Sequence, residues 1–458
     1  MRVSQFGIAL IETIDYSQRF FAQESHAAET GKQMTQQSAI ATVQEIISPL
    51  NKGLGALDQA VEPSEIAKRK WNLLHEDLSL PTAVLYKEKL DHNLHWMQQF
   101  ISAYGMKLAP HGKTTMAPTL FAMQLGSGAW GITLATAHQT QAAYAHGVRR
   151  VLMGNQLVGK ENMAIVARLL RDPEFEYYCL VDAREQVEQL GRFFGAQGLK
   201  VRVLLEVGVA GGRAGVRDDA QLSAVIEALA KHSDVIELCG VELFEGVLHD
   251  EAPVREFLGR AVEIMRRLLG EKRFSRTPAI LTGAGSAWYD VVADVFSAAA
   301  FGDAVEIILR PGCYLTHDVG AYREAQTKIL ERNPIAHKMK SGLIPALQVW
   351  AYVLSIPEPE KAIVGMGKRD AAFDSGLPVP ALHFRPGAAS PKASLPHWTV
   401  TKMMDQHAFL EIKAGDDVRV GDMIAFDIAH PCLTFDKWRT LPVVNAAFDV
   451  VDVVQTFF

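Results

Sequence analysis

The sequence predicts an α/β protein in which a (β/α)8 TIM-type barrel is followed by a smaller all-β domain. Eight short apolar segments alternate with segments of helical length, as the strands and helices of such a barrel do. Near residue 330 the helical periodicity fades, and Pro, Gly and β-rich runs take over. The 458 residues also exceed the roughly 250 that one barrel uses, which favours two domains. We expect an N-terminal extension over 1–80 that packs partly with the β domain, the barrel over 81–330 and the β domain over 331–458.

Composition excludes several classes of protein. Hydrophobic residues make up 48% and charged residues 21%, which is typical of a globular chain and not of a disordered one. Lys and Arg number 46 against 52 Asp and Glu, so no basic field for nucleic acid or an acidic membrane surface is expected. No stretch approaches the roughly 20 apolar residues of a membrane helix.

The cysteines and the N-terminus indicate the compartment. Four cysteines are too few for a disulfide framework in so long a chain: Cys179, Cys239, Cys313 and Cys432. Residues 1–21 contain an apolar stretch broken by Glu12 and Asp15, with no cleavage pattern after it. A soluble, cytoplasmic protein is therefore expected.

The elements before the barrel are a strand and a long helix. Residues 39–50 are compatible with a helix. Residues 82–86 are predicted to form a short apolar strand. It is a ninth strand beside the eight of the barrel, and we assign it to the second domain. Apolar residues then recur in steps of four and three up to Gly105, which predicts an amphipathic helix: Leu90, Leu94, Met97, Ile101 and Tyr104.

The barrel strands follow in order. They are predicted over 106–110, 131–136, 151–155, 177–182, 201–207, 236–243, 279–282 and 305–309. Helices are predicted between them, among others over 186–194, 222–231 and 254–269. A doubly wound open sheet has a similar alternation, and the count of eight strands favours the closed barrel. Strands of the β domain are predicted over 347–354, 397–403, 409–412, 423–428 and 443–458.

Lys113 is the first candidate for chemistry. The first barrel strand runs into His111-Gly112-Lys113, and the C-terminal ends of barrel strands carry the functional residues. A lysine removed from bulk water can act as an amine nucleophile. A solvated loop lysine is the alternative interpretation.

Two glycine-rich turns are further candidates. Thr282-Gly283-Ala284-Gly285-Ser286 follows a strand, and its backbone N–H groups and Ser286 hydroxyl suit a phosphate. Arg213 lies in a glycine-rich turn after the strand over 201–207 and suits a carboxylate, a phosphate or an aromatic nitrogen. An ordinary tight turn and a surface ion pair are the alternatives.

A candidate metal pair lies in the β domain. His430 and Cys432 directly follow a predicted strand, and one residue apart on an extended chain they would point to the same side. Imidazole with thiolate favours zinc over magnesium or calcium. A packed histidine beside an inert buried thiol is the alternative.

Together these motifs resemble the D-serine dehydratase and D-threonine aldolase family of fold-type III pyridoxal-phosphate enzymes, which share an alanine racemase-like barrel. The matching segments are Ala109-Pro110-His111-Gly112-Lys113, Gly212-Arg213-Ala214-Gly215-Val216, Thr282–Ser286, Arg310-Pro311-Gly312-Cys313-Tyr314 and His430-Pro431-Cys432. They occur in the family's order over residues 80–458.

The resemblance implies a role for each site residue. Lys113 would carry pyridoxal 5'-phosphate as a Schiff base and act as the base at Cα. Gly283, Gly285 and Ser286 would bind the phosphate with help from Tyr314, Arg213 would face the pyridine nitrogen, and Gln156 with Asn155 would line the pocket. His430 and Cys432 would hold Zn²⁺, with Mn²⁺ or another divalent cation as the alternative. A homodimer is expected by analogy.

The resemblance also implies the reaction. The cofactor accepts electrons from Cα, and a metal on the β-hydroxyl makes it a better leaving group. We therefore expect an ammonia-lyase that converts a D-3-hydroxy amino acid, such as D-serine or D-threo-3-hydroxyaspartate, to a 2-oxo acid and ammonia. Family dehydratases tend to carry His-x-Cys and aldolases His-x-Asp, so Cys432 favours dehydration. A D-threonine or 3-hydroxy-D-aspartate aldolase, a racemase and a non-catalytic pyridoxal-phosphate protein remain alternatives. Phe244 departs from the tyrosine that relatives often place near the cofactor.

Overall fold

Eight parallel strands form the first sheet, as the sequence predicts. The computed structural model describes residues 45–458. Within this range the sheet has the order β2-β9-β8-β7-β6-β5-β4-β3. The strands are β2 Lys107–Leu108, β3 Ile132–Leu134, β4 Arg150–Gln156, β5 Glu176–Val181, β6 Val201–Val207, β7 Ile236–Leu243, β8 Ala279–Gly283 and β9 Val305–Leu309. The edges β2 and β3 meet through a bridge between His111 and Thr133, and the Thr133 N–H donates to the Pro110 carbonyl at 2.9 Å. These bonds close the sheet, so the alternative of an open sheet is excluded.

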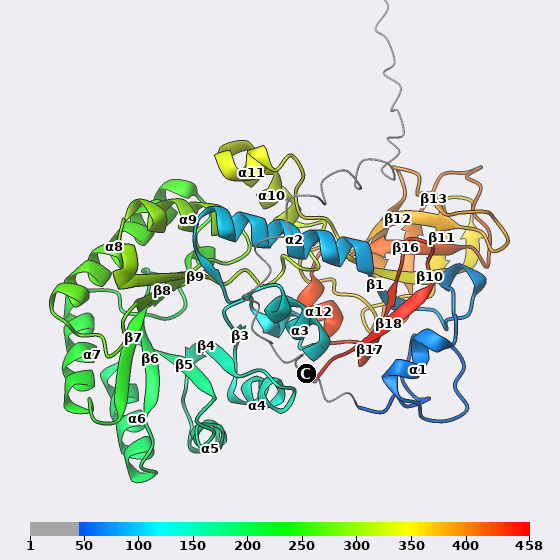
Figure 1. Cartoon of the computed structure of the whole chain (residues 1–458). Helices are drawn as coiled ribbons and strands as arrows, with labels where there is room; N and C mark the ends of the chain where they lie inside the picture. The colour runs from blue at the N-terminus through cyan, green and yellow to red at the C-terminus, as the bar shows by residue number, and fades with distance from the viewer. Residues whose placement is uncertain (1–44) are drawn as a thin grey trace, which may run out of the picture. The chain divides into compact units, whose positions relative to one another are not determined.

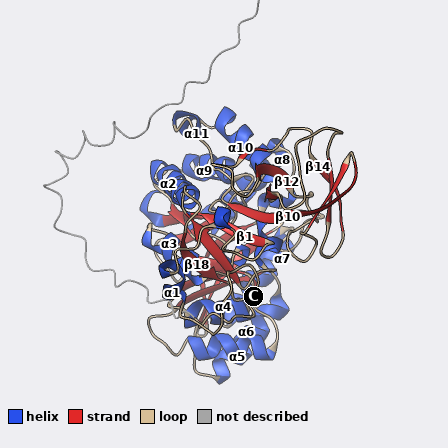
Figure 2. Ribbon diagram, turned by 90° about the vertical axis from the view of Figure 1, so that its right-hand side faces the viewer, coloured by secondary structure: helices blue, strands red, loops and turns tan. Residues whose placement is uncertain are grey.

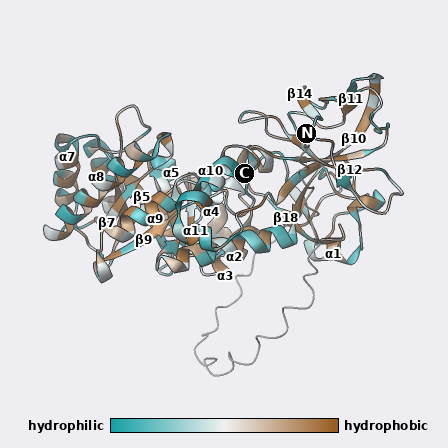
Figure 3. Cartoon of the chain, turned by 90° about the horizontal axis from the view of Figure 1, so that it is seen from above, coloured by the Kyte–Doolittle hydropathy of each residue, from teal (hydrophilic) through white to brown (hydrophobic). Residues whose placement is uncertain are grey.

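Helices follow the strands and cover the outside of this sheet (Figure 1). They are α3 Pro118–Gly126, α4 Ala137–Ala145, α5 Lys160–Leu169, α6 Arg184–Ala196, α7 Asp219–Lys231, α8 Glu251–Gly270, α9 Tyr289–Ala298 and α10 Ala321–Arg332. The helices α7 and α8 each bury an apolar stripe and expose charged residues, so hydrophilic and hydrophobic stretches both appear along them (Figure 3). No helix within residues 45–458 combines the length and apolar composition that a membrane span requires.

The second domain consists mainly of antiparallel strands and loops (Figure 2). Its main sheet has the order β13-β12-β16-β10-β1-β17-β18, and β11, β15 and β14 continue from β10. The strands are β1 Thr82–Tyr86, β10 Leu347–Glu358, β11 Lys361–Val364, β12 Val379–Phe384, β13 Lys392–Ala393, β14 Thr399–Met403, β15 Ala408–Glu411, β16 Met423–Asp427, β17 Thr440–Val444 and β18 Val450–Gln455. The predicted run 443–458 covers parts of two strands, and β11 to β13 were not predicted because they are short and β12 contains a proline.

The strand β1 belongs to this second sheet, as predicted. It pairs antiparallel with β10 and parallel with β17, and the chain then enters the barrel through α2 Lys87–Ala103. Residues upstream of β1 pack against the same sheet: Ile47, Leu54, Ile66 and Leu73 share an apolar cluster with Trp350 and Met423. The expectation of a helix over 39–50 is wrong for residues 45–50, because Ile47 forms a β-bridge with Val61. The rest of that stretch lies outside the described residues.

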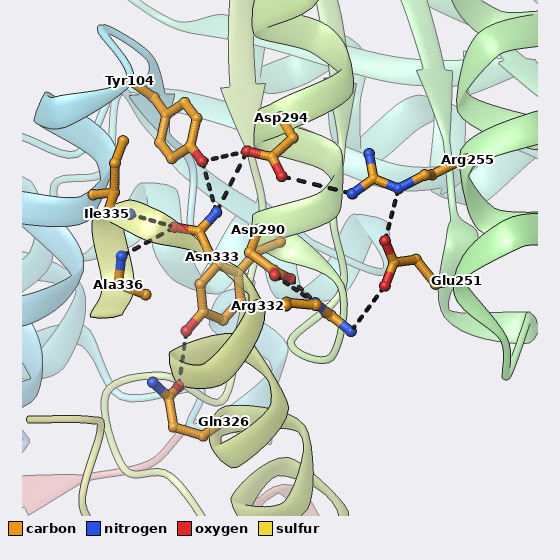
Figure 4. Close-up of polar contacts among 11 residues, drawn as sticks. Tyr104, Glu251, Arg255, Asp290, Asp294, Gln326, Arg332, Asn333, Ile335 and Ala336 are labelled. Carbon is orange, nitrogen blue, oxygen red and sulfur yellow. Dashed lines mark hydrogen bonds and ion pairs between the residues drawn. The ribbon is translucent and has the colours of Figure 1, made fainter. Parts of the chain in front are cut away.

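A polar network joins the helices at the end of the barrel segment (Figure 4). Arg332 donates to both carboxylate oxygens of the buried Asp290 at 2.7 Å. The next residue, Asn333, caps the short helix α11 Pro334–Lys338 and donates to the Tyr104 hydroxyl at 2.7 Å. Tyr104 in turn donates to Asp294 of α9. The network therefore connects α2 with α9, α10 and α11.

Candidate active site at the mouth of the barrel

Lys113 lies directly after β2, at the C-terminal edge of the parallel sheet. It belongs to a short 3-10 helix, Gly112–Thr114, and is exposed. Two residues earlier, the buried imidazole of His111 has a pKa well below its usual value, first because of burial and then because of the positive charges of Lys113, Arg310 and Arg213. Three cations thus surround a neutral imidazole at the barrel mouth.

Two buried carboxyl groups face these cations from neighbouring strands. Glu206 on β6 is paired in register with Glu242 on β7. Burial, and then the charge of Glu242, raises the pKa of Glu206 to about 8, and burial raises that of Glu242. Arg310, which follows β9, donates to the Glu242 carboxylate and to the Leu243 carbonyl. The centre of the mouth is therefore a buried arginine held by a carboxylate.

Several polar atoms at this centre have no hydrogen-bond partner among the described residues. They are His111 Nδ1, Glu242 Oε2 and Arg310 Nε. Beside them Gly154 lets Arg310 approach the strand closely, since a Cβ there would lie 3.0 Å from Arg310 Nη1 and 3.8 Å from His111 Nε2. Buried polar groups are rarely left unpaired, so these three atoms mark a candidate place for a polar ligand.

Some backbone N–H groups of the glycine-rich loop after β8 already have hydrogen-bond partners within the chain. The N–H groups of Ala284 and Gly285 donate to the buried carboxylate of Glu245, at 3.1 and 2.6 Å. Ser286 Oγ accepts the N–H of Cys313 at 3.2 Å, which brings together the loops after β8 and β9. The Ser286 hydroxyl hydrogen remains free for an anion, whereas the N–H of Gly285 is already bonded to Glu245.

The other predicted pocket residues lie around the same rim. Gln156, at the end of β4, donates to Glu206 Oε2 at 2.5 Å, and Asn155 donates to the Ala135 carbonyl. The guanidinium of Arg213 is exposed and lies over the Phe244 ring, 4.8 Å from its centroid. The Arg213 turn, Phe244 and Glu206 line one small cavity.

Tyr314 is more deeply buried than the predicted role suggested. Its side chain is 2% exposed, and its hydroxyl accepts a hydrogen bond from Gln124 of α3 at 3.2 Å. Burial raises its pKa, so it is a neutral phenol.

The metal pair is brought together, but not on an extended chain. His430 is the N-cap of a short helix, α12 Pro431–Phe435, and Cys432 lies in its first turn, which corrects the sequence-based geometry. The pKa of His430 is raised, first by Cys432 and also by Asp374, and that of Cys432 is lowered, first by Cys313 and also by His430.

Asp374 completes the surroundings of His430. Its carboxylate lies 2.8 Å from His430 Nδ1, which leaves Nε2 as the ring nitrogen free for another partner. A carboxylate on the second nitrogen is the usual orienting partner of a metal-binding histidine. Residues 45–458 contain no group of three or more His, Cys, Asp or Glu side chains arranged around one metal position.

The β domain meets the barrel mouth at this pair. Cys432 Sγ lies 3.5 Å from the hydroxyl of Thr114, the residue next to Lys113, and 3.7 Å from Cys313 Sγ. Segments far apart in sequence thus place His430 and Cys432 beside the candidate lysine.

Sequence reasoning gave no role to three residues that the structure places at the centre. Glu206 and Glu242 each interrupt an otherwise apolar strand near its C-terminal end, and that interruption was an available signal. Arg310 was quoted only as part of a motif. A fourth missed residue, Asp374 beside His430, carried no signal, because it lies in a loop 56 residues before that partner.

Comparisons with protein families match both domains. A family described as "Alanine racemase, N-terminal domain" matches residues 86–300, and one described as "Putative serine dehydratase domain" matches residues 346–444.

Individual relatives are more distant. The chain is 26% identical to a D-threonine aldolase of Arthrobacter sp. over 372 residues, covering 80% of this chain and 89% of the relative. It is 29% identical to a D-threo-3-hydroxyaspartate dehydratase of Delftia sp. over 150 residues, covering 32% and 39%. Among solved structures, a D-threonine aldolase from Filomicrobium marinum superimposes with a TM-score of 0.70 at 21% identity, covering 84% of this chain and 97% of that one. This last likeness concerns the fold.

Proposed function

The chain belongs to the family that contains D-serine dehydratase-like and D-threonine aldolase-like enzymes with an alanine racemase-like barrel, and on this premise we propose that it is a pyridoxal-phosphate-dependent lyase of D-3-hydroxy amino acids. The specific reaction proposed is β-elimination, which releases ammonia and a 2-oxo acid from D-serine or D-threo-3-hydroxyaspartate.

The residues at the barrel mouth fit pyridoxal phosphate. The unpaired atoms of His111, Glu242 and Arg310 offer hydrogen-bond partners to a polar ring. Ser286 provides a hydroxyl donor for a phosphate at one end, and Lys113 provides a primary amine at the other. When bound, the cofactor supplies an electron sink for the bond that breaks at Cα.

Lys113 would hold the cofactor through Nζ and would act as the base that removes the Cα proton of the substrate. Its position after a barrel strand, beside Thr114 and Cys432, supports this role. The neutral His111 leaves the cationic charge of the mouth on Lys113 and the arginines.

The geometry supports Arg310, rather than Arg213, as the partner of the ring nitrogen. Arg310 is 6% exposed, is fixed by Glu242 and has an unpaired Nε. Arg213 is exposed at the rim beside Glu206 and Phe244, a position that suits the carboxylate of an incoming substrate. We assign these two roles accordingly.

His430 and Cys432 fit a divalent metal, for which zinc is the first choice. Imidazole and thiolate are preferred zinc ligands, and Asp374 orients the imidazole. Two protein ligands leave positions open for water and substrate. A metal there would polarise the β-hydroxyl of the substrate.

The observation that carries the proposal is the contact between Cys432 and Thr114. It links the candidate metal ligands to the loop of the candidate lysine. A β-hydroxyl bound near His430 would therefore lie close to the base at Cα, and elimination requires both groups at neighbouring carbons. The thiolate in this pair supports dehydration, as the family tendency implies.

A specific observation favours a second candidate, a D-threonine or 3-hydroxy-D-aspartate aldolase. The similarity to the Arthrobacter D-threonine aldolase extends over 80% of the chain, far more than the similarity to the dehydratase. The same site performs this cleavage if the β-hydroxyl loses its proton instead of leaving.

Product analysis decides between the two reactions. The purified holoenzyme is incubated with D-serine, D-threonine and 3-hydroxy-D-aspartate, and 2-oxo acid, ammonia and aldehyde are measured. Equal amounts of oxo acid and ammonia are expected. Aldehyde with glycine and no ammonia would make the protein an aldolase, and no reaction with any D-amino acid would contradict both candidates.

We also propose a homodimer, by analogy with the fold. Light scattering on the eluting protein gives the mass. A monomer with full activity would contradict the proposal.

A further inference from the structure

Two thiols from different domains are in contact at the edge of the proposed site. The Sγ atoms of Cys313 and Cys432 lie 3.7 Å apart, although 119 positions separate the residues in sequence. Cys313 belongs to the loop after β9, and Cys432 to the first turn of α12. Both are free thiols. The contact therefore depends on the docking of α12 against the barrel.

The remaining cysteines have no such contact. Cys179 lies on β5 and Cys239 on β7, and the strand β6 runs between them. Two strand spacings separate their backbones by roughly 10 Å, beyond the reach of a disulfide. The chain thus has one pair of thiols in contact. The other two cysteines serve as internal controls for any test of disulfide formation.

We propose that Cys313 and Cys432 form a reversible intramolecular disulfide, a modification site that joins the β domain to the barrel. A disulfide has an S–S length of about 2.0 Å, so the sulfur atoms must approach by less than roughly 2 Å. Cys432 lies in a helix of five residues and Cys313 in a loop, so both elements are short. The displacement that the bond requires therefore falls on a loop and a short helix, not on a strand of the barrel.

Access determines the order of the steps. Cys313 is 4% exposed, whereas Cys432 is partly exposed. A small disulfide such as oxidised glutathione thus reacts first at Cys432: its sulfur bonds to one glutathione sulfur, and the other glutathione leaves as a thiolate. Cys313 then loses its proton and attacks Cys432 Sγ, which expels the second glutathione. Two protein thiols are oxidised, and one small disulfide is reduced to two thiols.

The bond changes what Cys432 can do. It consumes the sulfur that the proposed metal site requires, so the metal and the disulfide exclude each other. It also fixes α12 against the loop after β9, next to Thr114. Loss of lyase activity on oxidation is thus expected, and this consequence rests on the proposed function, whereas the disulfide itself does not.

Peptide mapping tests the disulfide on the full-length protein. Wild type and the Cys313→Ser variant are treated with a chelator and oxidised glutathione, alkylated, digested without reduction and analysed by mass spectrometry. Wild type should yield a peptide that links Cys313 to Cys432, with Cys179 and Cys239 alkylated, and a reducing agent should remove the link. Cys313→Ser should stop at the mixed disulfide, with one glutathione on Cys432.

Two results would overturn the inference. One is a stable glutathione adduct on Cys432 in wild type without any linked peptide, and the other is an unmodified Cys432 in both proteins. A Cys179→Ala, Cys239→Ala double variant should form the link as wild type does, which excludes scrambling. If the link forms and leaves turnover unchanged, the metal role of Cys432 fails while the disulfide stands.

Discussion

Glu206 and Glu242 stand opposite each other on the adjacent strands β6 and β7, and both carboxyl groups are buried at the mouth of the barrel, 3% and 1% exposed. Only Glu242 has an arginine partner, Arg310, whereas Glu206 accepts a hydrogen bond from the amide of Gln156. Two carboxyl groups that are paired on adjacent strands in a buried site do not both ionise readily, because their negative charges repel each other. One of them, Glu206, is therefore expected to hold a proton at neutral pH.

Glu206→Gln should make the protein less sensitive to alkaline pH. The pKa of Glu206 is raised to about 8, so the folded state binds a proton that the unfolded state releases at the ordinary carboxyl pKa. Between these two pKa values the unfolded state holds fewer protons, and the free energy of unfolding falls as pH rises. The glutamine stays neutral at every pH, so the variant should not lose stability in this way. Urea unfolding at about pH 5 and about pH 9 gives the fall in the free energy of unfolding for wild type and for the variant. An equal fall in the two proteins would show that Glu206 is ionised throughout.

Lys113→Ala should abolish covalent attachment of pyridoxal phosphate. Without the Nζ amine the cofactor binds only through its phosphate and ring, so the visible absorbance band of the lysine-bound form should be absent. Lys107→Ala is the matched control, because Lys107 is also exposed but lies at the start of β2, away from the mouth. A band of full intensity in Lys113→Ala would assign the attachment to another lysine.

Arg310→Lys and Arg213→Lys should separate the two arginine roles. A lysine at 310 cannot replace both hydrogen bonds of Arg310 and the free Nε, so we expect the Kd of pyridoxal phosphate to rise roughly 10- to 100-fold. Arg213→Lys should leave this Kd nearly unchanged and raise the KM for substrate. Fluorescence titration of the apoenzyme gives the Kd directly. The opposite pattern would return the ring nitrogen to Arg213.

The barrel was predictable from sequence because its signal is local. Each strand is a short apolar run next to a periodic helix, and β6, β7 and β9 have the predicted bounds. The lysine, the glycine-rich loop and the His-x-Cys pair were singled out as candidates because a strand end or a short spacing marks them. The β domain gave weaker signals, since β11 to β13 are short, and β12 contains a proline.

The site's interior was not predictable, since it depends on contacts between distant segments. Nothing in the sequence pairs Arg310 with Glu242, 68 positions away, or Asp374 with His430. Nor does it indicate that Glu245 accepts the N–H groups of the glycine-rich loop. These partners are fixed by strand register and by the docking of the two domains.

Asp374→Asn should weaken metal binding without removing a ligand. The carboxylate fixes the orientation of His430 and makes its imidazole a stronger donor, and loss of such a partner typically costs about 10- to 100-fold in metal affinity. Competition with a chromophoric chelator measures the Kd for Zn²⁺. His407→Ala is the control, because His407 is an exposed histidine of the same domain. Equal zinc affinity in Asp374→Asn and wild type would contradict the orienting role.

Arg332→Gln should destabilise the fold far more than Arg255→Gln, although both arginines belong to the same network (Figure 4). Arg332 donates twice to Asp290, whose carboxylate is 1% exposed, so its loss leaves a buried charge without a partner. Breaking such a pair costs about 3 kcal/mol or more. Arg255 is 43% exposed and binds the partly exposed Glu251 and Asp294, and surface pairs of this kind contribute about 0–1 kcal/mol. Urea titration gives the free energy of unfolding of each variant relative to wild type. Similar losses in the two variants would mean that water reaches Asp290 and contradict the prediction.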